Sequence, residues 1–113
     1  MPYISINTSA ALSDANKATL VSELGRLITI IPGKTEADLI VDLSTSRAMF
    51  MGGKKTPSAY IDLRVYTKTT DEAKKLFTRE VFTLLNHELG IKTEHLYMTI
   101  AEFDNWGYDG EFH

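Results

Sequence analysis

Cysteine is absent from this chain of 113 residues. Without a thiol the protein cannot form a disulfide, use a cysteine nucleophile or bind a metal through thiolates. The redox compartment stays open, because disulfide-free proteins occur in every compartment. The sequence also lacks a long apolar run and a basic segment followed by one, so it predicts neither a membrane span nor a signal peptide. We therefore expect a cytoplasmic protein that does not bind membranes.

A strong charge of one sign is missing as well, since the formal net charge is −3. The lysine pairs Lys54-Lys55 and Lys74-Lys75 are interleaved with acids, which argues against the basic surface of a nucleic-acid binder. The histidines His87, His95 and His113 are too scattered to share one metal. We expect no metal site and a single domain spanning residues 1–113.

What the sequence does contain is a regular pattern of strands and helices. Alternating apolar residues predict four strands, and apolar residues three and four apart predict two helices that begin after capping residues, Ser13 and Thr70. The predicted strands cover residues 3–8, 38–45, 59–66 and 96–101, and the helices cover 13–31 and 70–89. Residues 46–57 read as a loop with an apolar centre, and residues 102–113 as an ordered, aromatic tail with short strands.

The two halves of the chain repeat each other. The first helix is followed by Gly33-Lys34-Thr35-Glu36 and a strand, and the second by Gly90-Ile91-Lys92-Thr93-Glu94 and a strand. Each half is a strand, a helix and a strand, which favours a right-handed parallel unit. Two such units predict a two-layer α+β fold, with a four-stranded mixed sheet and both helices on one face. Large side chains on the other face predict oligomerisation through it: Tyr60, Asp62, Arg64, Tyr97 and Thr99.

The start Met1-Pro2 is a candidate site. If Met1 is removed, Pro2 becomes a free secondary amine at the end of a strand, where it can act as a base. Met-Pro starts are common, however, and most have no catalytic role. Pro2 therefore needs support from other residues.

Five motifs occur in a recognisable order: Met1-Pro2 before a strand, Pro32-Gly33-Lys34, the Met49 to Pro57 loop with Gly52-Gly53, the segment Ile91 to Tyr97, and the tail Asn105 to Phe112. Together they make the chain resemble the macrophage migration inhibitory factor family of the tautomerase superfamily. The resemblance implies a homotrimer whose three sheets enclose a central channel. It also implies catalysis without a cofactor.

The resemblance also assigns roles. Pro2 would be the catalytic base, and Lys34, which on its own reads as a helix cap, would bind a substrate carboxylate. Tyr66 would contact substrate through its backbone N–H, Tyr97 would enter the neighbouring subunit's pocket, and Thr99 stands where relatives have asparagine. Four aromatic residues of the tail would line the pocket or simply pack the tail: Phe103, Trp106, Tyr108 and Phe112.

The implied activity is keto–enol tautomerisation of phenylpyruvate-like 2-oxo acids, and of dopachrome-like compounds. The alternative is a cytokine-like ligand with a vestigial pocket, exported without a signal peptide to act on a receptor. A metabolite-binding regulatory module is a third reading, because the same element order describes ferredoxin-like folds. Ser58-Ala59-Tyr60-Ile61 replaces the Cys-x-x-Cys of some relatives, which excludes thiol oxidoreductase activity.

Overall fold

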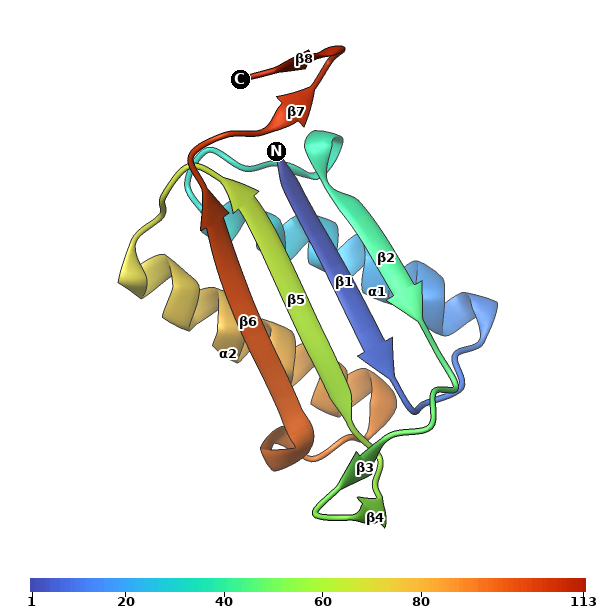
Figure 1. The fold of residues 1–113 in the computed structure, drawn as a ribbon. Coiled ribbons are helices and arrows are strands. Elements are labelled where there is room, and N and C mark those ends of the chain that lie inside the picture. The colour runs from blue at the N-terminus through green and yellow to red at the C-terminus, as the bar shows by residue number, and fades with distance from the viewer.

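Two helices pack against one face of a four-stranded sheet in the computed structural model, which describes residues 1–113 (Figure 1). The helices are α1 (Asp14–Leu27) and α2 (Asp71–Leu89). The strands of the sheet are β1 (Pro2–Thr8), β2 (Ile40–Ser44), β5 (Ala59–Tyr66) and β6 (Leu96–Phe103). The predicted two-layer α+β fold is confirmed.

The strand order in the sheet is β2-β1-β5-β6. β1 pairs with β2 in parallel and β5 with β6 in parallel, while β1 and β5 are antiparallel neighbours. Each half of the repeat therefore forms one parallel unit, and the two units meet along the central pair β1 and β5. This arrangement confirms the mixed sheet and places the beginning of β1 beside the end of β5.

The helices begin at the predicted caps. The hydroxyl of Ser13 accepts from the backbone N–H of Asn16 at 3.1 Å, and Thr70 accepts from Ala73 at 3.1 Å. α2 ends at Gly90, which adopts a positive φ of 67°. α1 ends earlier than predicted, because residues 28–30 tighten into a 3₁₀ turn, Ile28–Ile30.

The core lies between the sheet and the helices. Alternate residues of β1 and β5 are buried, as the period of two predicts. They pack against the apolar stripes of the two helices in one cluster of 17 buried side chains. The core fixes which face of each strand meets the helices, and so which side chains of β1 face outward.

Short elements extend the fold at both ends of the sheet (Figure 1). Residues 46–57, expected as a loop, contain a hairpin, β3 (Phe50–Met51) and β4 (Lys54–Lys55). The predicted tail strands are β7 (Gly107–Tyr108) and β8 (Glu111–Phe112), which also form a hairpin. Two 3₁₀ turns, Glu36–Asp38 and Thr93–His95, precede β2 and β6. The strand predicted from residue 38 therefore begins at Ile40.

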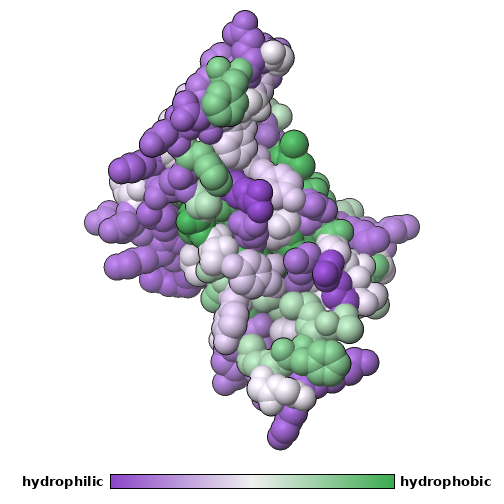
Figure 2. All heavy atoms as spheres, viewed as in Figure 1, coloured by the Kyte–Doolittle hydropathy of each residue, from purple (hydrophilic) through white to green (hydrophobic).

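The second face of the sheet has no helix over it (Figure 1). Figure 2, viewed from the same side, shows hydrophilic and hydrophobic residues mixed on this side of the molecule. The Tyr3 hydroxyl donates to Asp42 at 2.7 Å, and the Tyr60 hydroxyl to Thr99 at 2.8 Å. No helix is long and apolar enough to cross a membrane.

Candidate active site

The candidate site is built around the N-terminal end of β1. Pro2 is buried, and it pairs with Val65 of the antiparallel neighbour β5. The backbone N–H of Tyr66, the last residue of β5, donates to the Met1 carbonyl oxygen at 3.2 Å. Pro2 is thus held at the edge of the core.

Lys34, in the turn after α1, places its side chain next to Tyr66 at the end of β5. Gly33 has a φ of +79°, a conformation that favours glycine, and the Lys34 N–H donates to the Ile31 carbonyl at 3.1 Å. The half-buried side chain then places its Nζ 2.7 Å from the carbonyl oxygen of Tyr66. One ammonium group is therefore anchored beside the start of β1.

The pKa of the Met1 α-amino group depends on burial and on the charges near the start of β1. Burial is the main cause that lowers its pKa, and the positive charge of Lys34 adds to the effect. The carboxylate of Asp38 opposes them and raises the pKa. The surroundings thus favour a neutral amine, which is the form that can accept a proton.

Aromatic side chains form a wall around Tyr66, the residue that contacts both Met1 and Lys34. The ring centroid of Tyr66 lies 6.5 Å from that of Trp106 and 6.2 Å from that of Tyr108. Phe103 continues the wall, with its ring 5.9 Å from Trp106. Tyr108 of β7 and Trp106 just before it thus lie against Tyr66 at the end of β5, and Phe103 ends β6. The wall offers an apolar, π-rich surface of the kind that an aromatic substrate contacts.

Three of the expected site residues lie elsewhere in the chain. Tyr97, with 58% of its surface exposed, and Thr99 occupy β6 on the uncovered sheet face, and Tyr97 pairs with Tyr60. Phe112, with 76% of its surface exposed, lies in β8 opposite Gly107. The chain therefore assembles six of the nine residues: Pro2, Lys34, Tyr66, Phe103, Trp106 and Tyr108.

Two residues near the site were not expected from the sequence. Asp38 acts on the N-terminal amine by its charge. The ring centroid of His113 lies 4.3 Å from that of Tyr108, and its backbone forms two hydrogen bonds with Trp106, of 3.1 and 2.9 Å. The sequence pattern placed Asp38 in the predicted strand 38–45 and indicated neither its effect on the amine nor the contact of His113.

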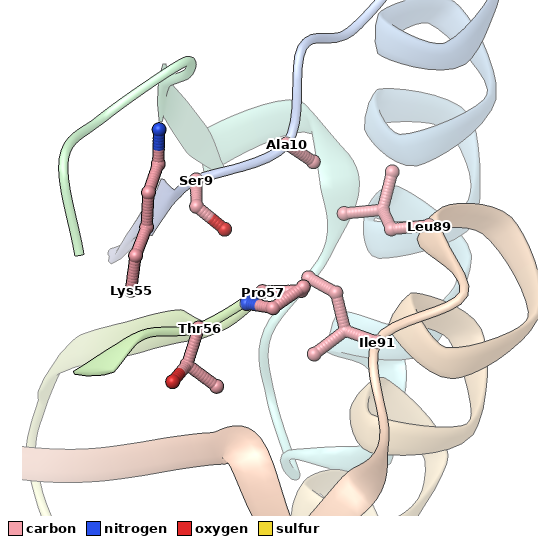
Figure 3. A pocket seen from close by; sticks show the side chains of 7 residues that line it. All are labelled: Ser9, Ala10, Lys55, Thr56, Pro57, Leu89 and Ile91. Atoms are coloured by element: carbon pink, nitrogen blue, oxygen red, sulfur yellow. The ribbon is translucent and has the colours of Figure 1, made fainter. Parts of the chain in front are cut away.

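The cavities of the single chain lie away from Pro2. The largest, of about 500 Å³, lies between the end of β1, the segment before β5 and the end of α2 (Figure 3). Another, of about 310 Å³, is lined by the β3–β4 hairpin together with Tyr60, His95 and Tyr97. No group of three or more potential ligand side chains is placed to hold a metal ion. Pro2 lines none of the cavities, and a cavity of about 350 Å³ on the β7–β8 hairpin includes Tyr108.

One family model matches nearly the whole chain. The family model "Macrophage migration inhibitory factor (MIF)" matches residues 1–111. No curated protein sequence matches significantly. Among solved structures, Leishmania major MIF2 superposes with a TM-score of 0.91 at 22% identity, covering 100% of this chain and 97% of that one.

Two further structures share the fold. An Entamoeba histolytica MIF-like protein, EhMIF, has a TM-score of 0.87 at 24% identity, covering 99% of this chain and 98% of that one. A fused 4-OT protein described as an asymmetric trimer has a TM-score of 0.85 at 19% identity, covering 96% and 94%. Because the family model matches nearly the whole sequence, this chain belongs to the MIF family of the tautomerase superfamily.

Proposed function

We propose that the protein is a cofactor-free keto–enol tautomerase of phenylpyruvate-like 2-oxo acids, with Pro2 as general acid and base once Met1 is removed. Dopachrome-like compounds belong to the same class. The supporting observation is the convergence of Pro2, Lys34 and the Tyr66 backbone beside an aromatic wall. The Lys34 cation suits the carboxylate of an aromatic 2-oxo acid, the potential base Pro2 suits its enol proton, and the apolar wall suits its ring.

Removal of Met1 would change two groups of the site, the Pro2 nitrogen and the Tyr66 N–H. It turns the amide nitrogen of Pro2 into an amine, and it takes away the carbonyl oxygen to which the Tyr66 N–H donates at 3.2 Å. The freed N–H points at the position that the Met1 carbonyl has left. A substrate oxygen bound there would lie beside the new amine, within reach of the proton transfer.

The proposed reaction moves one proton. The neutral nitrogen of Pro2 takes the proton from the enol hydroxyl as the C–O bond becomes a carbonyl, and then delivers it to C3 to form the C–H bond. Lys34 binds the carboxylate as a charge-assisted partner, and the Tyr66 N–H stabilises the oxygen. Burial and Lys34, which favour the neutral Met1 amine, would act on the Pro2 amine in the same direction.

The active form would be a homotrimer. The sheet face without helices exposes Tyr97 and Ile40, at 58% and 63% of their surfaces, and the fused 4-OT relative is described as a trimer. In such an assembly Tyr97 and Thr99 of one subunit would complete the site of the next. This accounts for their distance from Pro2 within one chain.

Blocking the proline nitrogen tests the proposal. A variant with one residue inserted between Met1 and Pro2 keeps that nitrogen in an amide, and we expect it to lose phenylpyruvate tautomerisation by at least about 100-fold. Intact mass verifies that Met1 is absent in the wild type, and circular dichroism verifies that the variant folds. Full activity in the blocked variant would refute Pro2 as the base. A Pro2→Gly variant that lacks turnover and still activates a receptor would favour the cytokine-like alternative.

A further inference from the structure

A carboxylate stands next to the candidate site in addition to the Lys34 ammonium. Asp38 lies four residues after Lys34, at the end of the 3₁₀ turn Glu36–Asp38. The Asp38 N–H donates to the Thr35 carbonyl at 3.4 Å, and the Leu39 N–H donates to the Glu36 carbonyl at 3.1 Å. These bonds fix the backbone of Asp38 directly ahead of β2.

The sheet register brings this turn to the N-terminus. β1 and β2 are parallel, and Tyr3 is level with Ile40. The 3₁₀ turn ends at Asp38, two residues before Ile40, and therefore lies beside the N-terminal end of β1. The exposed carboxylate acts on the Met1 amine by its charge, in the direction opposite to Lys34. Opposite charges therefore flank the start of β1.

Two other cations near this part of the sheet have carboxylate partners of their own. Arg64 forms an ion pair with Asp62 at 3.1 Å and lies 5.7 Å over the Tyr3 ring, on the uncovered sheet face. Lys74 of α2 pairs with Glu102 of β6 at 3.0 Å. The residues expected from a neighbouring subunit, Tyr97 and Thr99, carry no formal charge at neutral pH. The charged side chains that act on the N-terminal amine are thus one cation, Lys34, and one carboxylate, Asp38.

We propose that Asp38 is a specificity-determining residue that restricts the site to substrates with one carboxylate. This rests on the proposed function, because Lys34 must bind the carboxylate next to the reacting carbons. A second carboxylate on a small substrate would approach the Asp38 carboxylate and be repelled by it. Neutral or cationic groups at the far end of the substrate meet no such repulsion.

The size of the effect follows from the exposure of Asp38. Charge interactions between exposed groups change equilibria by small factors, and salt screens them. We therefore expect Asp38 to discriminate against a dianion by about three- to tenfold at low ionic strength. The discrimination should shrink as salt is added.

The test compares two enol substrates with the protein after Met1 removal. Phenylpyruvate provides the monoanion and oxaloacetate the dianion. In an Asp38→Asn variant we expect kcat/KM for oxaloacetate to rise by about three- to tenfold, with little change for phenylpyruvate. The matched control is Glu36→Gln, which removes a carboxylate from the same turn and should alter neither value. An unchanged ratio of the two substrates in Asp38→Asn would overturn the proposal.

A second measurement separates this proposal from the tautomerase assignment. NMR titration of the Pro2 amine needs no turnover, and because Asp38 opposes Lys34, the Asp38→Asn change should lower the pKa of that amine. If the wild type turns over neither substrate, the proposed function fails, and binding of the two anions is then compared through the Pro2 chemical shifts. Equal binding of both anions before and after the substitution, with an unmoved amine pKa, would exclude any role for Asp38.

Discussion

Lys34 shows how one side chain can serve the fold and the site together. Its ammonium donates to the Tyr66 carbonyl at 2.7 Å, which ties the turn after α1 to the end of β5. The same ammonium is half-buried and acts on the N-terminal amine. A bound carboxylate would add a second partner to a group that is already positioned, so little side-chain entropy would be lost on binding.

Replacing Lys34 should therefore affect substrate binding more than proton transfer. We expect Lys34→Ala to raise KM for phenylpyruvate by about 10- to 100-fold, the effect of losing a charged hydrogen bond of about 1.5–3 kcal/mol. Steady-state kinetics measure this change, and kcat should fall much less. Lys55→Ala, which removes an exposed lysine of β4, is the control. Equal KM values in the two variants would remove Lys34 from substrate binding.

The loop after β5 is held by a carboxylate of the neighbouring strand. Glu102 of β6 accepts from the Thr69 N–H at 2.6 Å and from the Lys74 ammonium at 3.0 Å. The Thr67 N–H donates to the Phe103 carbonyl at 2.8 Å, although Thr67 has a positive φ of 72°. The loop is tied to β6 at two points, and these contacts fix the end of β5, where Tyr66 contacts Met1 and Lys34.

The Glu102 contacts should make stability depend on pH. The Thr69 N–H, and then Lys74, lower the pKa of the Glu102 carboxyl below its ordinary 4.5. A lowered folded-state pKa stabilises the fold above the unfolded value, and this stabilisation disappears as pH falls through the folded value. We expect Glu102→Gln to lower Tm at neutral pH and to match the wild type in strong acid. Thermal melts against pH, with exposed Glu94→Gln as control, test this. A Tm difference that persists unchanged in acid would contradict it.

The elements of the fold were largely predictable because local patterns determine them. Alternation in β1 and β5 located the buried face, and the repeat of strand, helix and strand predicted two parallel units. Periodicity could not locate the start of β2, because the hydrogen bond from the Leu39 N–H to Glu36 makes a 3₁₀ turn of residues that also suit a strand. The hairpin at Gly52-Gly53 depends on the positive φ of both glycines, which a loop reading does not specify.

The site was less predictable, because its parts come from distant segments. Nothing local links Lys34 to Tyr66, and their contact arises from the antiparallel meeting of the two repeats. The roles of Pro2 and Lys34 came from family resemblance rather than from spacing. Asp38 was missed because its importance depends on register with β1, and the contact of His113 with Tyr108 because the path of the tail carries no periodic pattern.

Aromatic side chains are exposed at the β3–β4 end of the sheet, where a second copy of the chain would cover them. Phe50 in the β3–β4 hairpin exposes 64% of its surface, and Tyr97 of β6 exposes 58%. Both line the cavity of about 310 Å³ at this end of the sheet. Burying a phenylalanine contributes about 1.5–3 kcal/mol, and a symmetric trimer repeats that gain in each interface. Assembly and catalysis would then be coupled if, as proposed, Tyr97 completes the site of the neighbouring subunit.

Phe50→Asp should separate the subunits and abolish turnover in one step. The substitution removes apolar area and would bury a carboxylate without a partner, a change costly enough to disfavour the interface. Light scattering should record monomers where the wild type forms trimers, and tautomerase activity should fall with the trimer fraction. Leu76→Asp is the matched control, because Leu76 lies on α2 with 41% of its surface exposed and belongs to the layer away from the uncovered sheet face. A trimeric Phe50→Asp protein, or an active monomer, would show that this hairpin does not join the subunits around the site.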